Sequence, residues 1–96
     1  PLTLVRFELM EGLRPAEARA MQHLVVLIRE SARKGDRVVA MEGGALAFLP
    51  ETDATQARPL LERVEARVRE QLADRYELAV HVIPRGRILA MVGALA

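Results

Sequence analysis

Residues 33–53 read Arg-Lys-Gly-Asp-Arg-Val-Val-Ala-Met-Glu-Gly-Gly-Ala-Leu-Ala-Phe-Leu-Pro-Glu-Thr-Asp, and the order of elements in the chain follows from this stretch. Two short apolar runs, Val38 to Met41 and Ala45 to Leu49, are separated by a segment that contains Gly43 and Gly44. Glycines readily adopt the positive backbone angles of a tight hairpin turn. The stretch therefore predicts a β-hairpin.

The residues on either side of the hairpin carry helix-boundary signals. Arg33-Lys34-Gly35 combines cations and a glycine, which is typical of a helix C-terminus. Leu49-Pro50 leads into Glu51-Thr52-Asp53, whose side chains can cap a following helix. We therefore expect a helix, the hairpin and a second helix in that order.

Upstream of this framework, residues 2–9 alternate as a half-buried strand does, with Thr3, Val5, Phe7 and Leu9 on one face. Residues 10–14 are predicted to be a connection, and Pro15 to lie in the first turn of a helix. That helix is amphipathic, because its apolar residues recur at three- and four-residue spacings: Ala20, Met21, Leu24, Val25, Leu27, Ile28 and Ala32.

Downstream of the hairpin, Leu60, Leu61, Val64, Val68 and Leu72 form a second helical stripe. Pro59 predicts that this helix either begins close to it or bends there. Residues 76–84 alternate again and predict a final strand, followed by a turn at 85–87. The apolar tail 88–96 is compatible with an edge strand, a short helix or the start of a linker.

The predicted order β-α-β-β-α-β is that of an α+β, ferredoxin-like domain, with two helices on one face of a four-stranded antiparallel sheet. In this topology the first and third strands are central neighbours, which places Glu8 near the turn at residues 42–44. The other face of the sheet is left open.

Composition limits the function classes. Ninety-six residues that are 51% hydrophobic suit one domain, and a net charge of +1 gives no basic field for nucleic acid. The absence of Cys excludes disulfides and thiolate chemistry and favours a cytoplasmic location. His23 and His81 lack ligand spacing, so we expect no metal and no cofactor.

The ends of the chain suggest how the domain is organised. The tail 88–96 is far shorter than the roughly 20 apolar residues of a membrane span, so direct membrane insertion is not expected. Because the chain begins with Pro1, we expect a single domain, residues 1–96, excised from a longer protein.

Residues 36–53 resemble the signature of GGDEF domains, the diguanylate cyclase family. There an Asp and a short strand precede the signature turn, and a second strand ends in Leu-Pro-Glu-Thr-Asp, as residues 49–53 do here. Residues 2–8 and 77–83 are similar to the family's first and last strands. The resemblance covers almost the whole chain and implies a bacterial signalling protein.

The departures from the family signature imply that the domain is not an enzyme. Counted from Asp36, the signature turn is Glu42, Gly43, Gly44, Ala45 and Leu46; counted from the glycines, it is Gly43 to Ala47. In either register the metal-binding acid of the turn is missing. Active members use that acid and others to hold a triphosphate and two metal ions. Glu8 alone is a poor substitute for this set.

A second feature of the family is retained. Many cyclases bind their product, cyclic di-GMP, at an Arg-x-x-Asp tetrad five residues before the signature turn. Arg33 and Asp36 match this tetrad, and the resemblance places a supporting arginine at Arg63, with Arg67 one turn further on. Guanidinium groups can bind phosphate and stack on purines, and a carboxylate can accept from guanine N–H groups.

Two interpretations therefore remain open. In the first, an inactive regulatory domain binds cyclic di-GMP through these residues and signals to other domains of its own protein. In the second, the domain is a ligand-free module that forms a homodimer or docks a protein partner, and Arg33 and Asp36 only bond locally. The first predicts a pocket between the end of the first helix and the flank of the second, whereas the second predicts an exposed apolar patch.

Overall fold

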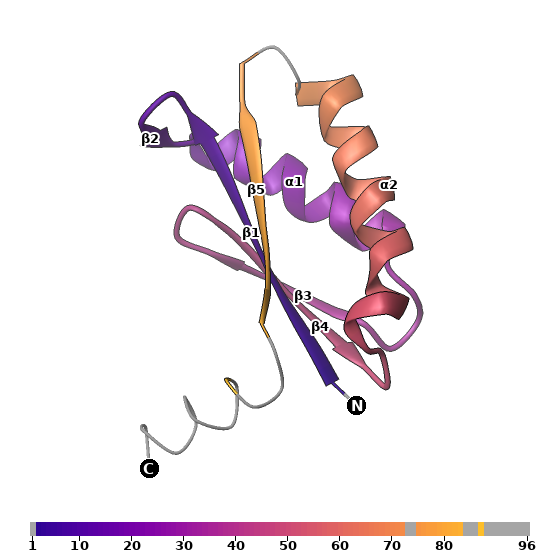
Figure 1. The fold of residues 1–96 in the computed structure, drawn as a ribbon. Coiled ribbons are helices and arrows are strands. Elements are labelled where there is room, and N and C mark those ends of the chain that lie inside the picture. Colours follow the sequence, from indigo (N-terminus) through magenta and orange to yellow (C-terminus); the bar gives the residue numbers. More distant parts are fainter. Residues whose placement is uncertain (1, 73–74, 84–86, 88–96) are drawn as a thin grey trace.

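The structure is a computed structural model that describes residues 2–72, 75–83 and 87. Its elements are β1 (Leu2–Glu11), β2 (Arg14–Pro15), α1 (Ala18–Ser31), β3 (Arg37–Met41), β4 (Gly44–Pro50), α2 (Ala54–Leu72) and β5 (Glu77–Ile83). Apart from the two-residue strand β2, this is the predicted β-α-β-β-α-β order (Figure 1).

The sheet has the strand order that the ferredoxin-like prediction requires. β1 pairs with β4 and with β5, and β3 pairs with β4, all antiparallel. The first and third long strands are therefore central neighbours, and Glu8 lies opposite Gly44. The fold prediction is confirmed, as is the placement of Glu8 beside the hairpin turn.

One face of the sheet packs against both helices and forms the core. On β1 the residues that point toward the helices are Thr3, Val5, Phe7 and Leu9, and all four are buried. The buried stripe of α1 contains Ala20, Met21, Leu24, Val25, Leu27, Ile28 and Ser31. Burying one large apolar side chain contributes about 1.5–3 kcal/mol, so this layer is the main source of stability. The alternation and the helical stripe predicted from the sequence are both confirmed.

The start of α2 is capped as the sequence suggests, by Asp53. Asp53 Oδ1 accepts a hydrogen bond from the backbone N–H of Gln56 at 2.8 Å, and Gln56 Oε1 accepts one from the N–H of Asp53 at 2.9 Å. This reciprocal arrangement satisfies two donors at the helix end. The helix begins at Ala54 and includes Pro59.

The prediction for residues 10–15 was wrong. β1 continues to Glu11, and Gly12, with φ of 62°, turns the chain back into β2. The N–H of Ala16 donates to the carbonyl of Leu9 at 2.8 Å, so Pro15 lies in a strand and α1 begins only at Ala18. A proline fits here because its ring nitrogen is not needed as a donor between the two strands.

The last strand ends at Ile83, one residue before the predicted end, and the tail 88–96 lies outside the described residues. In the part of the chain that the structure describes, no helix is both long enough and apolar enough to cross a membrane.

The two glycines of the hairpin are expected to respond differently to alanine. A Cβ on Gly44 would lie 1.7 Å from the carbonyl oxygen of Phe7, whereas Gly43, with φ of 80°, has its nearest neighbour at 3.9 Å. We expect Gly43→Ala to cost about 1–2 kcal/mol of backbone strain. Gly44→Ala should cost more than about 3 kcal/mol, because β1 and β4 must separate. Urea unfolding of both variants measures this; equal losses would contradict the close packing of β4 on β1.

Candidate functional site

The predicted ligand residues Arg33 and Asp36 lie on the loop between α1 and β3. The backbone N–H of Arg33 donates to Asp36 Oδ2 at 2.8 Å, and the N–H of Asp36 donates to the carbonyl of Arg33 at 3.0 Å. The side chain of Asp36 is half-buried, whereas Arg33 is exposed. The loop is thus closed on itself by two hydrogen bonds, and one oxygen of Asp36 is used in closing it.

Arg63 reaches this region from α2. Its Nη2 donates to the carbonyl oxygen of Ser31 at 2.8 Å, at the end of α1. A cation is favourable there because the last carbonyls of a helix carry partial negative charge. Since Arg33 follows Ser31 by two residues, Arg63 lies beside the start of the loop that carries Arg33 and Asp36. The fold therefore brings these three predicted residues to one end of the helical layer.

Arg67 is placed differently. Its Nη1 lies 2.9 Å from Glu30 Oε2, and both side chains are substantially exposed. Arg67 thus pairs with the side of α1, one turn away from the loop. Of the four predicted residues, it is the one that the structure joins to a carboxylate on a neighbouring helix.

This surface has the donors that an anionic ligand requires. Arg33 and Lys34 belong to the same loop as Asp36, and Arg63 bonds to the end of α1 two residues before this loop's Arg33. A guanidinium has five N–H donors, so Arg63 retains most of its capacity after it bonds to Ser31. The arrangement can bind a phosphate through the arginines and a purine edge through Asp36.

Three hollows lie elsewhere on the described surface. One of about 290 Å³, between α2 and β5, is lined by Glu65, Val68, Arg69, Tyr76 and Leu78. Two more, of about 330 and 280 Å³, lie on the open face of the sheet and share Arg6 and Glu8. None of these three is lined by the predicted ligand residues, which instead form part of the outer surface.

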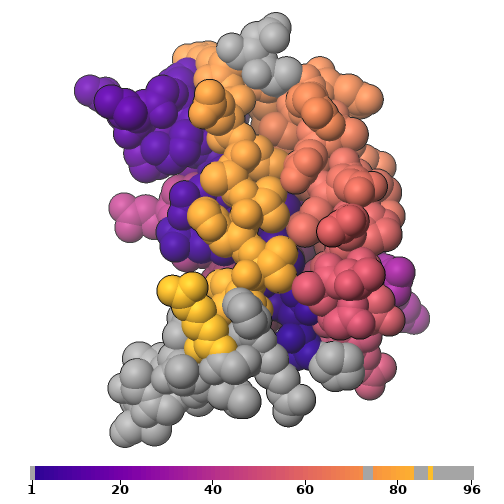
Figure 2. Space-filling view, in the orientation of Figure 1, coloured from indigo at the N-terminus to yellow at the C-terminus, as the bar shows by residue number. Residues whose placement is uncertain are grey.

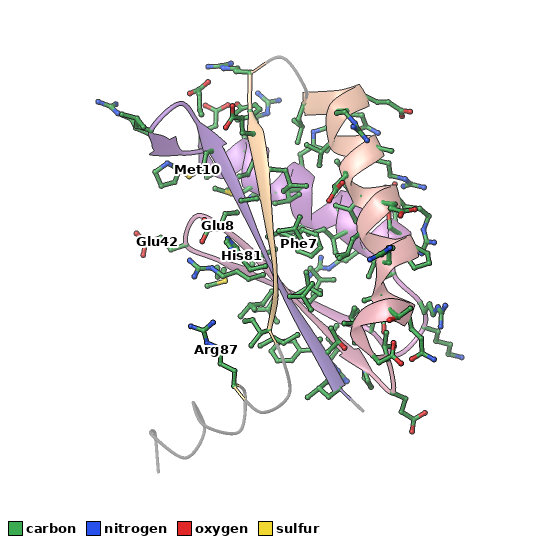
Figure 3. All side chains as sticks on the ribbon, viewed as in Figure 1. Phe7, Glu8, Met10, Glu42, His81 and Arg87 are labelled. Atoms are coloured by element: carbon green, nitrogen blue, oxygen red, sulfur yellow. The ribbon has the colours of Figure 1, made fainter. Side chains whose placement is uncertain are left out.

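The residues of the degenerate signature turn lie beside the hollow of about 330 Å³. Glu42 and Gly43 line it, together with Glu8, Met10 and Pro15 from the other side. Figure 3 shows Glu8, Glu42, His81 and Arg87 on the side of the sheet that faces away from α2. Gly44, Ala45 and Leu46 begin β4, and Ala45 is fully buried in the core. The position after the glycines thus points into the core, where alanine packs well.

Glu8 lies beside two nitrogen-bearing side chains, Arg6 and His81, that the sequence analysis did not connect with it. Glu8 Oε1 lies 3.0 Å from Arg6 Nη2, and Glu8 Oε2 lies 3.8 Å from His81 Nε2. The antiparallel register of β1 and β5 could have revealed this group, since it sets His81 directly opposite Arg6. Among the described residues, no three His, Asp or Glu side chains are grouped as a metal site requires.

The two arginines on α2 should contribute unequally to stability. Arg63→Ala removes a charged hydrogen bond to a partly buried helix-end carbonyl, and we expect a loss of about 1–2 kcal/mol. Arg67→Ala removes an exposed ion pair, and we expect a loss of no more than about 0.5 kcal/mol. Chemical denaturation of the two variants provides the comparison. A larger loss for Arg67→Ala would show that the contact between Arg63 and Ser31 does not hold the helices together.

Comparisons with known proteins support the fold. No protein-family model and no curated protein sequence matches this chain. Among solved structures, the chain is similar to the apo form of PelD residues 156–455 from Pseudomonas aeruginosa PA14, with a TM-score of 0.60 and 18% sequence identity. The match covers 97% of this chain and 37% of that PelD chain. The chain thus has the fold of about a third of the PelD fragment.

Proposed function

We propose that this chain is a catalytically inactive regulatory domain of the GGDEF type and that it binds cyclic di-GMP at Arg33, Asp36 and Arg63. The observation that carries the proposal is the hydrogen bond from Arg63 to the carbonyl of Ser31. It joins α2 to the end of α1, so that a supporting arginine lies beside the Arg-x-x-Asp loop.

The ligand chemistry assigns a role to each residue. Cyclic di-GMP carries two phosphodiesters and two guanines. Arg33 and Arg63 bind a phosphate and stack on a guanine, since a planar guanidinium does both. Asp36 Oδ2 is engaged by the loop backbone, so Oδ1 is the oxygen that accepts from guanine N–H groups. Arg67, one turn further along α2, adds positive charge to this edge.

The absence of catalysis in this proposal rests on the signature turn. Active members need a carboxylate after the glycines to hold their metal ions, and this chain has Ala45 and Leu46 instead. A methyl group and an isobutyl group supply no metal ligand. Glu8, which lines the same hollow as Glu42, is paired with Arg6 and lies near His81.

We further propose that the domain belongs to a longer bacterial, cytoplasmic signalling protein and transmits ligand binding to its other domains. This chain covers 37% of the PelD fragment, which supports the proposal that it is one part of a larger protein. The loop between α1 and β3 is a suitable output, because it connects the helical layer directly to the hairpin.

The second candidate function is a ligand-free protein-interaction module. It is favoured by the observation that the side chains of Asp36, Arg63 and Arg67 all make hydrogen bonds within the fold, while Arg33 bonds through its backbone N–H. These bonds account for the three side chains without a ligand. In this alternative the exposed apolar side chains of the sheet, such as Val39, contact the partner.

Calorimetric titration with cyclic di-GMP separates the two functions. We expect micromolar or tighter binding to the wild-type domain and at least a tenfold weaker affinity for Arg33→Ala. The arginine side chain is exposed, so its removal should leave the fold intact. Arg19→Ala is the matched control, because Arg19 is an exposed arginine near the opposite end of α1 and should bind as the wild type does.

GTP with magnesium serves as the competing nucleotide in the same titration. If the domain takes up GTP as well as cyclic di-GMP, or if Arg19→Ala weakens binding as much as Arg33→Ala does, the specific site is wrong. If cyclic di-GMP gives no heat at millimolar concentration, the ligand proposal fails and the interaction module is the better description.

A further inference from the structure

The outer edge of β5 is unusual for a sheet edge. Within residues 2–72 and 75–83, β5 pairs with β1 alone, and its seven residues read Glu-Leu-Ala-Val-His-Val-Ile. The strand contains neither Pro nor Lys, two residues with which proteins commonly block an open edge, and Glu77 at its start is its one acidic residue. Figure 1 looks onto this edge, and Figure 2 shows β5 at the surface beside α2.

The opposite edge of the sheet is better protected. There the guanidinium of Arg29 donates to the carbonyl oxygen of Val38 on β3, at 3.5 Å. A side chain from α1 thus binds one of the outward-facing backbone carbonyls of that strand. β3 is also shorter, with five residues against the seven of β5. The two edges are therefore not equivalent as sites for another strand.

The hydrogen bonds of β1 show which backbone groups of β5 face outward. The N–H of Leu9 donates to the carbonyl of Gly43, and the carbonyl of Leu9 accepts from the N–H of Ala16. The backbone N–H and C=O groups of odd-numbered residues of β1 are therefore directed toward β4 and β2. The backbone groups of even-numbered residues of β1 are consequently directed toward β5, where their partners are Glu77, Ala79, His81 and Ile83.

The remaining residues of β5, Leu78, Val80 and Val82, therefore direct their N–H and C=O groups away from the sheet. The same alternation, followed from β1 across β4 to β3, directs the backbone groups of Val38 away from the sheet. The hydrogen bond that the Val38 carbonyl accepts from Arg29 agrees with this direction. Three residues of β5 thus present backbone groups that no strand within residues 2–72 and 75–83 pairs with.

We propose that a second copy of this chain binds along the edge of β5, as an antiparallel pair of β5 strands related by a two-fold axis at Ala79. In this register Leu78 and the partner subunit's Val80 exchange hydrogen bonds. Glu77 lies opposite the partner subunit's His81, and the symmetric pair repeats on the other side of the axis. The two sheets then form one continuous sheet across the dimer.

Polar side-chain pairing selects this register over its neighbours. A shift of the axis to Val80 would also match outward groups with outward groups, but it would place Glu77 opposite the partner subunit's Ile83. An axis midway between Ala79 and Val80 would place a residue with outward backbone groups opposite one whose backbone groups are already bonded to β1. Of these registers, only the axis at Ala79 sets a carboxylate directly opposite an imidazole, which can donate a hydrogen bond to it, in a non-hydrogen-bonded backbone pair, where side chains come closest.

The flank of α2 beside β5 fits the same two-fold axis. The hollow of about 290 Å³ between α2 and β5 contains Glu65 and Arg69, which lie one helical turn apart. A second copy running antiparallel would set Glu65 toward the partner subunit's Arg69. Leu78, which also lines this hollow, would lose exposure at the interface. The helix and the strand thus carry self-complementary polar side chains along the same edge of the sheet.

The oligomeric state in solution, measured by sedimentation equilibrium without nucleotide, tests the proposal. We expect a reversible dimer for the wild-type chain. Val80→Pro removes an outward N–H without breaking the ladder to β1, and it should weaken the dimer by about tenfold or more. Ala40→Pro is the matched control, because the N–H of Ala40 is directed outward from β3 at the opposite edge of the sheet. The dimer of this variant should persist.

A charge exchange tests the register. His81→Glu should weaken the dimer, because the introduced carboxylate would lie opposite the partner subunit's Glu77 and the two like charges would repel. The double variant Glu77→Lys with His81→Glu should restore the dimer, since it sets unlike charges across the axis again. Circular dichroism of each variant verifies that the monomer is folded.

Three results would overturn the proposal: a wild-type chain that stays monomeric up to millimolar concentration, a dimer that Ala40→Pro and Val80→Pro weaken equally, or a double variant that fails to recover. If Val80→Pro does not fold, the charge exchange alone decides.

Discussion

The structure depends on the close approach of β4 to β1. Gly44 lies so near the backbone of Phe7 that no side chain fits between the two strands. This contact sets the register in which Glu8 faces Gly44, and with it the burial of Val5 and Phe7 against the helices. Because a shift of one residue would turn those side chains to the open face, the remaining strands and both helices can take only one arrangement around β1.

The candidate ligand site is a consequence of how the helices pack on this sheet. α1 ends at Ser31, and its last carbonyls need partners that the helix itself cannot provide. Arg63 supplies one of them, which ties α2 to the beginning of the Arg33–Asp36 loop. A side chain that stabilises the fold is thus also in position to bind an anion. Structural and ligand-binding roles are compatible in this residue, because one guanidinium serves several acceptors.

The open face and the outer edge of the sheet suggest two further uses of the same scaffold. On the open face, the carboxylate of Glu8 is paired with Arg6 on β1 and lies near His81 on β5, so its charge is balanced by a neighbouring guanidinium. On the edge of β5, the backbone groups of three residues are directed outward along an apolar strand. A regulatory domain that both binds a ligand and pairs with its copy can couple the two events through β1, which contacts β4 and β5 directly.

Local sequence patterns were enough to predict the order of elements, the hairpin and the capping of α2 by Asp53. They also predicted the buried faces of β1 and α1. Each of these features depends on residues that are close together in the chain. They misplaced Pro15, since a proline suits a strand beside β1 as well as a first helical turn. The partners of Arg63 and Glu8 became known only from the tertiary structure, because these side chains are bonded to or lie near residues on other elements. The same holds for the outward groups of β5. These features follow from register and helix packing, which join residues that are distant in sequence and that no local pattern specifies.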